Sequence, residues 1–277
     1  MIREALADTL GHLKNYPLLW AGGLIAALIT LLDLLIAGTD TVLAGRFQIL
    51  AFLVFPFIIA GSYGIIREKE GSLALYAQYG MEYYFRVLLP LLIILFAVLL
   101  TILLVLFSIS IVGIAPTADL AFFLGMGVSV PILLLTYFYD AFAVFRDEKI
   151  FDSIRASITM VLAYSWKILL FVAVNIAVLG SLLFGLAFVW AGLLWESMSE
   201  IAEMDPEIIS AMTGDEVMAM LGPDALFATA VVLFIWATIA TPFTIAFKAA
   251  FFQRLEQAPR VEQQVGVYDE KGRWYKY

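Results

Sequence analysis

Six long apolar runs constrain this 277-residue chain more than any other feature of its sequence. A bilayer core of ~30 Å takes about 20 helical residues at a rise of ~1.5 Å each. Runs of this kind cover residues 18–37, 47–66, 87–113, 120–145, 168–195 and 225–247. Only 14% of the residues are charged, whereas a soluble chain carries about a quarter. The sequence therefore predicts an all-α integral membrane protein with six transmembrane helices.

The distribution of lysine and arginine predicts how the chain is oriented in the membrane. Cytoplasmic loops of membrane proteins carry an excess of these residues. Of the 16 cationic residues, every one except Arg46 lies before the first run, after the second, after the fourth or after the sixth. We therefore expect a multi-pass plasma-membrane protein with both termini in the cytoplasm.

Three similar helix pairs follow one another, in repeats of about 1–67, 68–146 and 147–254. Before each odd-numbered run, apolar residues recur at helical spacing, which is typical of an amphipathic helix at the cytoplasmic interface. Ser72 and Asp147 are expected to cap the second and third of these helices. Each even-numbered run contains one proline that we expect to kink it, and these are Pro56, Pro131 and Pro242. The pattern indicates internal duplication, although proline is also frequent in unrepeated membrane helices.

A recognisable motif begins near the end of the fourth run. Residues 139–148 read Tyr-Asp-Ala-Phe-Ala-Val-Phe-Arg-Asp-Glu, and Asp-Ser-Ile-Arg-Ala-Ser at 152–157 and Trp166-Lys167 follow. This stretch resembles archaeal six-span membrane proteins of unassigned function. It is similar, more loosely, to the membrane domain attached to some glycerophosphodiester phosphodiesterases. The resemblance implies a fold and no reaction, because the hydrolytic domain of those enzymes is a separate module with no equivalent in this chain.

Two acidic residues inside the runs are functional candidates, because charge within a membrane is costly. Asp140 follows a tyrosine, as in intramembrane aspartyl proteases, but those enzymes need two carboxylates that share a proton. Asp33 and Asp140 differ in expected depth by more than ~10 Å, so they cannot form such a pair. We expect Asp140 to pair with a cation such as Arg146 or to cap the neighbouring interfacial helix. Asp33 is expected to reach the headgroups or to pair with Arg46.

Two further polar residues are candidates, Asn175 inside the fifth run and Lys248 directly after the sixth. Asn175 is expected to form a hydrogen bond between helices. The side chain of Lys248 is expected to extend to the cytoplasmic interface.

The segment 196–224 is an acidic insertion between the fifth and sixth runs, with eight acidic residues and no cation. Carboxylates of this kind can hold calcium, but a solvated acidic loop is the simpler interpretation. Asp205 and Pro206 are expected to start one short helix there, and Asp215 a second. The chain has no cysteine and one histidine, His12, and no arrangement of a nucleophile and a base is present. We therefore predict no catalytic residues, no metal and no cofactor.

The tail, residues 255–277, follows the six-helix domain of residues 1–254. Alternation around Asp269-Glu270-Lys271-Gly272 predicts a small β-hairpin over residues 265–277. The alternative is a disordered tail.

Function is less constrained than fold. The almost wholly apolar centre favours a non-enzymatic scaffold or a lipid-interacting module. A transporter or channel subunit, with a cavity among the proline-kinked helices, is the alternative. The expected partners are membrane lipids, and a protein partner or a second copy of the chain, but no nucleic acid.

Overall fold

The computed structural model describes residues 1–37, 41–113, 117–202, 204–205, 207, 212–258, 267–268 and 274–275. The side chains of residues 37, 41–46, 200, 202, 215, 217 and 218, and those of the strand residues, lie outside this description. The helices are α1 (Ile2–Asn15), α2 (Leu19–Ala37), α3 (Thr41–Glu68), α4 (Leu73–Glu82), α5 (Tyr84–Ile111), α6 (Ala118–Leu135), α7 (Tyr139–Phe145), α8 (Ile150–Ala163), α9 (Ser165–Leu193), α10 (Trp195–Ala202) and α12 (Gly214–Gln257).

Six stretches in the described part of the chain are long and apolar enough to cross a membrane, which confirms the predicted multi-pass membrane protein. They lie in α2, α3, α5, α6 with α7, α9 and α12. The predicted fourth span is not one helix, because the chain turns at residues 136–138 between α6 and α7. The sixth helix is longer than predicted and is interrupted at Gly222, whose φ of 69° is a left-handed value that glycine adopts readily.

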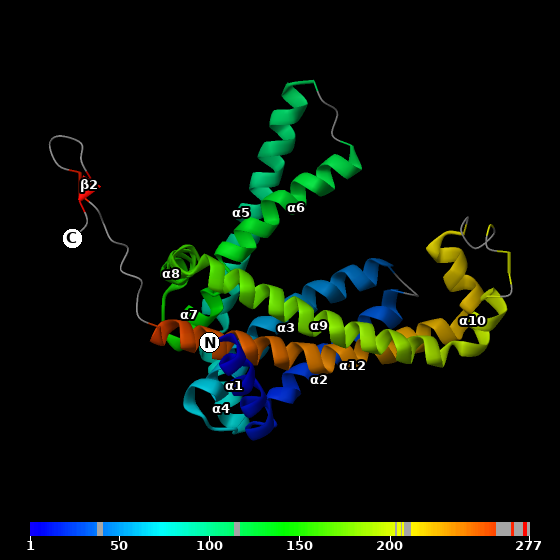
Figure 1. Cartoon of the computed structure of the whole chain (residues 1–277), viewed down its shortest axis with the longest axis horizontal. Coiled ribbons are helices and arrows are strands. Elements are labelled where there is room, and N and C mark those ends of the chain that lie inside the picture. The colour runs from blue at the N-terminus through cyan, green and yellow to red at the C-terminus, as the bar shows by residue number, and fades with distance from the viewer. Residues whose placement is uncertain are drawn as a thin grey trace.

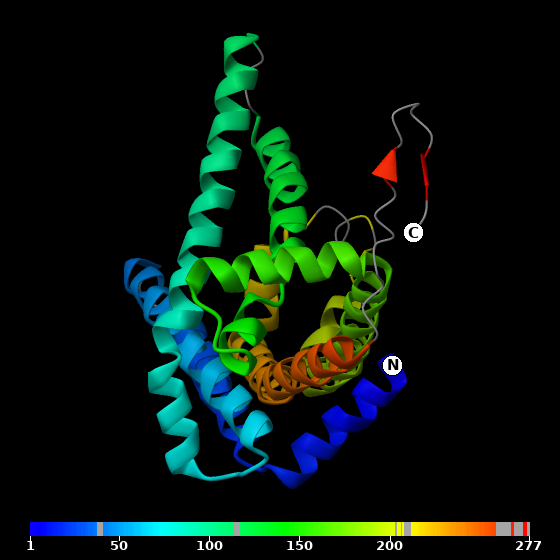
Figure 2. The same cartoon turned by 90° about the vertical axis from the view of Figure 1, so that its left-hand side faces the viewer.

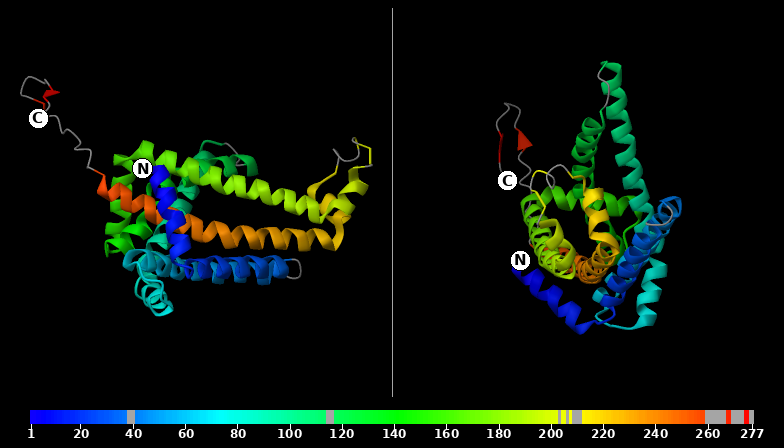
Figure 3. Two further views of the ribbon diagram at one scale, coloured as in Figure 1. Left: turned by 60° about the horizontal axis from the view of Figure 1, so that its bottom comes forward. Right: turned by 90° about the vertical axis from the view of Figure 1, so that its right-hand side faces the viewer.

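Four of the spanning helices lie alongside one another, and the α5–α6 hairpin leads away from them. In the left panel of Figure 3, α12 runs between α9 and α2. Helix α3 packs against α2 and also contacts α12, and Figure 2 shows it on the opposite side of the bundle from α9. Figures 1 and 2 both show α5 and α6 rising from the end of the bundle at which α7 and α8 lie.

The two ends of the bundle differ in charge. Helices α1, α4, α7 and α8 lie at one end, together with the ion pairs of Arg67, Arg86, Arg146 and Arg254, and we call it the cationic end. Helix α10 and the start of α12 lie at the opposite end of the α9–α12 pair, and we call this the acidic end.

Glycines let the helices approach closely at the cationic end. A side chain added at Gly61 would lie 2.8 Å from the backbone oxygen of Tyr76, and one at Gly64 would overlap the ring of Tyr79. Conversely, one at Gly80 of α4 would lie 2.8 Å from Phe57 of α3. Helices α3 and α4 therefore interlock, with the aromatic rings of each seated on the glycines of the other. The predicted cap of α4 is confirmed, because the Ser72 hydroxyl accepts a hydrogen bond from the Leu75 N–H at 3.2 Å.

A second close approach joins α2 to α12. Pro242 has no N–H, so the carbonyl of Thr238 loses its partner within the helix. A side chain on Gly23 of α2 would collide with this carbonyl and would lie 2.8 Å from the Pro242 ring. The absence of a side chain at Gly23 thus lets α2 cover the site where proline interrupts the bonding of α12.

The core is concentrated at the cationic end. The Phe171 ring lies 4.3 Å from Phe251 and 4.6 Å from Phe247, measured between ring centroids, and Phe138 stacks beside them. A smaller buried cluster at the acidic end contains Leu194, Leu221, Ala225 and Ala228.

The tail forms two short strands, β1 (Val267–Tyr268) and β2 (Trp274–Tyr275). They pair antiparallel, with Val267 opposite Tyr275 and Tyr268 opposite Trp274. The predicted connection lies outside the described residues.

Candidate functional site

A buried ion pair joins α7 to α12. The Lys248 ammonium lies 2.7 Å from Asp140 Oδ1 and 2.8 Å from Oδ2. The side chain of Asp140 is 5% exposed and that of Lys248 11% exposed. Both residues lie within candidate membrane spans. The pair is therefore a fixed feature of the protein interior and not a surface salt bridge.

The remaining hydrogen-bonding positions of the pair are also occupied. Asp140 Oδ1 accepts the N–H of Ala141 at 2.8 Å, and Oδ2 lies 3.4 Å from the hydroxyl of Tyr63. The ring of Tyr137 covers the ammonium, with its centroid 4.3 Å from Nζ. A buried charge is tolerated when it is paired and hydrogen-bonded, so these contacts explain how both charges remain inside.

The ion pair lies beside the break between α6 and α7. Such a break frees backbone groups that lipid cannot satisfy. Ser157 of α8 supplies both missing partners, since its hydroxyl donates to the Leu135 carbonyl at 3.0 Å and accepts from the Phe138 N–H at 3.0 Å. The side chain of Ser157 is fully buried. Helix α8 therefore stabilises the broken span directly.

The structure corrects two predictions about these residues. Asp140 pairs with a cation, as predicted, but the cation is Lys248 and not Arg146, which forms an ion pair with Glu256. Asp140 does not cap α8, which has no side-chain cap. Lys248 does not extend to the interface, because Asp140 offers its charge a partner inside. The sequence marked Asp140 as a charge within an apolar run and Lys248 as a charge at the end of one, but they are 108 positions apart and no spacing rule connects them.

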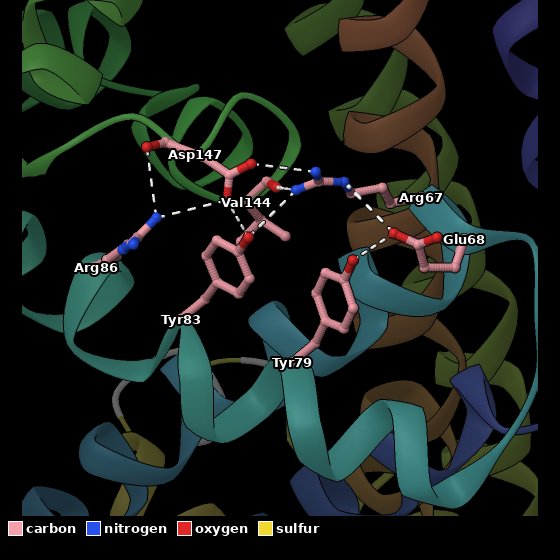
Figure 4. Close-up of polar contacts among 7 residues, drawn as sticks. All are labelled: Arg67, Glu68, Tyr79, Tyr83, Arg86, Val144 and Asp147. Atoms are coloured by element: carbon pink, nitrogen blue, oxygen red, sulfur yellow. Dashed lines mark hydrogen bonds and ion pairs between the residues drawn. The ribbon is translucent and has the colours of Figure 1, made fainter.

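A second polar cluster, centred on Asp147, ties together the loops at the cationic end (Figure 4). Arg67 donates to the Val144 carbonyl at 2.5 Å and to Asp147 at 3.1 Å. Arg86 lies 3.5 Å from the same carboxylate, and the Tyr83 hydroxyl donates to it. The hydrogen bond from Tyr83, followed by the bonds and charge of Arg67, lowers the pKa of Asp147 below its ordinary value of 3.8.

The predicted capping role of Asp147 is therefore wrong. Helix α8 begins three residues later, at Ile150, and has no side-chain cap. Asp147 instead holds the α7–α8 loop in a left-handed conformation, with φ 56°. Beside it, the Tyr79 hydroxyl donates to Glu68, and burial raises the pKa of Tyr79 to about 12, so that it remains a neutral donor.

The other predicted site residues lie apart from the ion pair. Asp33 accepts a hydrogen bond from Gln48 at 3.4 Å, and the side chain of Arg46 lies outside the described residues. The side-chain oxygen of Asn175 is buried and accepts no hydrogen bond from any described residue, so the predicted interhelical bond is not seen at this atom. Pro56, Pro131 and Pro242 lie inside α3, α6 and α12. The conformational breaks lie elsewhere, at Gly222 and at residues 136–138.

The acidic insertion is only partly described. Asp205 accepts the N–H of Glu207 at 3.0 Å, whereas Pro206 lies outside the description. Helix α12 is capped by Thr213 and not by Asp215, because Thr213 and Glu216 form a reciprocal pair of hydrogen bonds. That bonding lowers the pKa of Glu216. Within the described ranges, no three acidic or histidine side chains come together as a metal site.

Comparison with known proteins gives a family without an assigned activity. Residues 1–255 match the model of the family described as "Domain of unknown function (DUF7847)", and the chain therefore belongs to this family. No curated protein and no solved structure matches the chain.

Proposed function

We propose that this member of the DUF7847 family is a non-enzymatic membrane module that holds lipid hydrocarbon between spans fixed at one end. The observation that carries the proposal is the difference in burial along the spans. Helix α6 contains no buried residue, and α9 buries only Ile168, Phe171 and Leu186. By contrast, every residue from Phe138 to Val144 is buried at the cationic end. Hydrocarbon must therefore cover the helix surfaces that protein leaves open.

The ion pair supports a structural role. Both oxygens of Asp140 and the ammonium of Lys248 already have partners. Ser157 forms hydrogen bonds to the backbone groups of Leu135 and Phe138 at the helix break. No described contact leaves the pair free to act on a substrate. It fixes α7 to α12, and so fixes the cationic end from which the spans diverge.

The finer features of the sequence fit this proposal. We place the cationic end in the cytoplasm, with α1, α4 and α8 as amphipathic helices at the plasma-membrane interface, each before one pair of spans. The buried residues of α1 are Ala5, Thr9 and Leu13, and those of α8 are Ser153, Ser157 and Val161. The equal spacing of these two sets supports a duplication that relates the first and third repeats, whereas α4 buries Tyr76, Tyr79 and Gly80 at a different spacing. Relatedness to archaeal six-span proteins, and to the membrane domain of some glycerophosphodiester phosphodiesterases, remains a proposal that rests on residues 139–167.

Native mass spectrometry of the purified full chain tests the function. We expect lipid to remain bound after stepwise detergent exchange, and thermal stability to fall when lipid is removed and to recover when it is added back. A chain that releases all lipid without losing thermal stability would contradict the proposal. The same spectra report whether a second copy or another protein is bound.

A transporter or channel subunit is the second candidate, and the break at residues 136–138 favours it. Discontinuous helices near ionisable residues form the binding sites of many transporters. The test is ion and proton flux into proteoliposomes containing the wild type or Asp140→Asn. Flux that depends on Asp140 would replace our first proposal with this one, and absence of flux would leave the first in place.

A further inference from the structure

The α2 and α12 helices are in close contact near the middle of the bundle and separate toward the acidic end. They are in tight contact at Gly23, where an added side chain would collide with Thr238 and Pro242. Two turns and more beyond this contact, a groove of about 500 Å³ opens between the helices. It is lined by Leu31 and Leu35 of α2 and by a face of α12 from Pro223 to Ile235.

The groove has the chemistry and the length of a site for one hydrocarbon chain. Every residue that lines it is apolar. A dry apolar cavity of ~150 Å³ already accepts a molecule as large as benzene, and this groove is larger. From Pro223 to Ile235, α12 rises by ~18 Å, close to half of a ~30 Å bilayer core. The groove thus matches a chain that enters from one leaflet.

The rim of the groove carries negative charge. Asp224 is exposed and lies directly after the lining residue Pro223. It precedes Phe227 by three positions and Val231 by seven, so it shares their face of the helix. Seven other acidic residues and no cation occupy the insertion from Glu196 to Asp224. An anionic head group would be repelled there, whereas a cationic one would be attracted.

From this combination we infer that the groove binds a single-chain amphiphile with a positively charged head group, its chain between α2 and α12 and its head beside Asp224. The inference rests on the proposed lipid-holding function and names the ligand class. The shared chemistry is an alkyl chain with an ammonium head, whether it belongs to a membrane lipid or to a free amphiphile.

Binding of three matched probes to the full chain in a neutral detergent tests the inference. The probes are hexadecyltrimethylammonium, hexadecyl maltoside and hexadecanesulfonate, each detected by native mass spectrometry at equal micromolar concentration. We expect one ammonium probe per chain, with about thirtyfold weaker retention of the sulfonate, since the two head groups differ by two unit charges and each contributes ~1 kcal/mol near such a surface. Endogenous lipid that co-purifies and is displaced by the ammonium probe identifies a lipid source, and an empty site identifies a free amphiphile.

Two pairs of variants locate the site. Leu35→Trp fills the groove and should abolish binding, whereas Leu32→Trp should not, because Leu32 is similarly exposed on α2 but does not line the groove. Asp224→Asn should retain the maltoside and lose the preference for the ammonium. Asp119→Asn, which alters an exposed acid on α6, should keep that preference.

The outcomes separate this inference from the proposed function. Equal retention of all three probes, or full binding by Leu35→Trp, would overturn the inference while leaving the lipid-holding function intact. Failure of the chain to retain any lipid or probe would overturn both. Because Asp224 is exposed, its variant tests the charge preference without disturbing the core.

Discussion

The cationic and acidic ends of this bundle share α9 and α12 but are stabilised in different ways. At the cationic end, ion pairs, seated aromatic rings and glycine contacts join α3, α4, α7, α8 and α12. At the acidic end, the only described side-chain hydrogen bond between α9 and α12 runs from Trp190 to Thr229, at 3.0 Å. Water drives apolar surfaces together, but lipid does not. Spans therefore stay together only where close packing or polar contacts hold them, and elsewhere they separate.

The largest loss of stability should follow removal of one partner of the buried ion pair at the cationic end. Lys248→Met leaves the Asp140 carboxylate buried and unpaired, which costs about 3–5 kcal/mol in the free energy of unfolding. Thermal unfolding in detergent measures the loss. The control is Asp140→Leu combined with Lys248→Met, which removes both charges and should restore most of the stability. Equal loss in the single and double variants would show that the charge pair is not what holds α7 to α12.

The next largest loss of stability should follow when a side chain is added at Gly23, where α2 lies against α12. Gly23→Leu places atoms against the Thr238 carbonyl and the Pro242 ring, and overpacking of this kind costs about 3 kcal/mol at its upper range. The matched control is Gly180→Leu in α9, where an added side chain meets nothing within 4 Å. Equal thermal stability of these two variants would contradict the close approach.

Removal of the Ser157 hydroxyl, which bonds to the backbone at the break between α6 and α7, should lower the free energy of unfolding by about 2 kcal/mol. Ser157→Ala leaves the Phe138 N–H and the Leu135 carbonyl without a partner in an apolar surrounding. Ser108→Ala removes a hydroxyl that donates to the Leu104 carbonyl on exposed α5, and it should have little effect. Hydrogen exchange at residues 135–138 should rise in the first variant alone. Unchanged exchange would show that water, and not Ser157, provides the hydrogen bonds of these two backbone groups.

The smallest change in stability is expected at the Asp147 cluster, and it should depend on pH. Because the pKa of Asp147 is lower in the folded protein than its ordinary 3.8, its contribution is present above about pH 4 and is lost as the pH falls through the folded value. Thermal stability of wild type and Asp147→Asn should therefore differ at pH 6 and converge toward pH 2. Exposure of Asp147 keeps the difference small, ~1 kcal/mol or less. A difference that persists at low pH would assign the effect to packing.

Much of the candidate site could be identified from the sequence, but not its connections. Asp140 was recognisable as an ionisable residue inside an apolar run, and Lys248 as one directly after a run. Their pairing was not, since it depends on how α7 and α12 lie side by side. Ser157 carried no signal, because a serine on a helix looks the same whether it faces water or completes a broken span. The break itself was hidden by the continuous apolar run from residue 120 to 145.

The sequence by itself determined that the chain crosses a membrane, how often, and where its charges gather, because these properties follow from the length of apolar runs and the cost of burying charge. Only the tertiary structure decided which helices touch, where a span breaks and which buried charges pair. These features arise from contacts between residues far apart in the chain, and such contacts depend on shape at the level of single atoms.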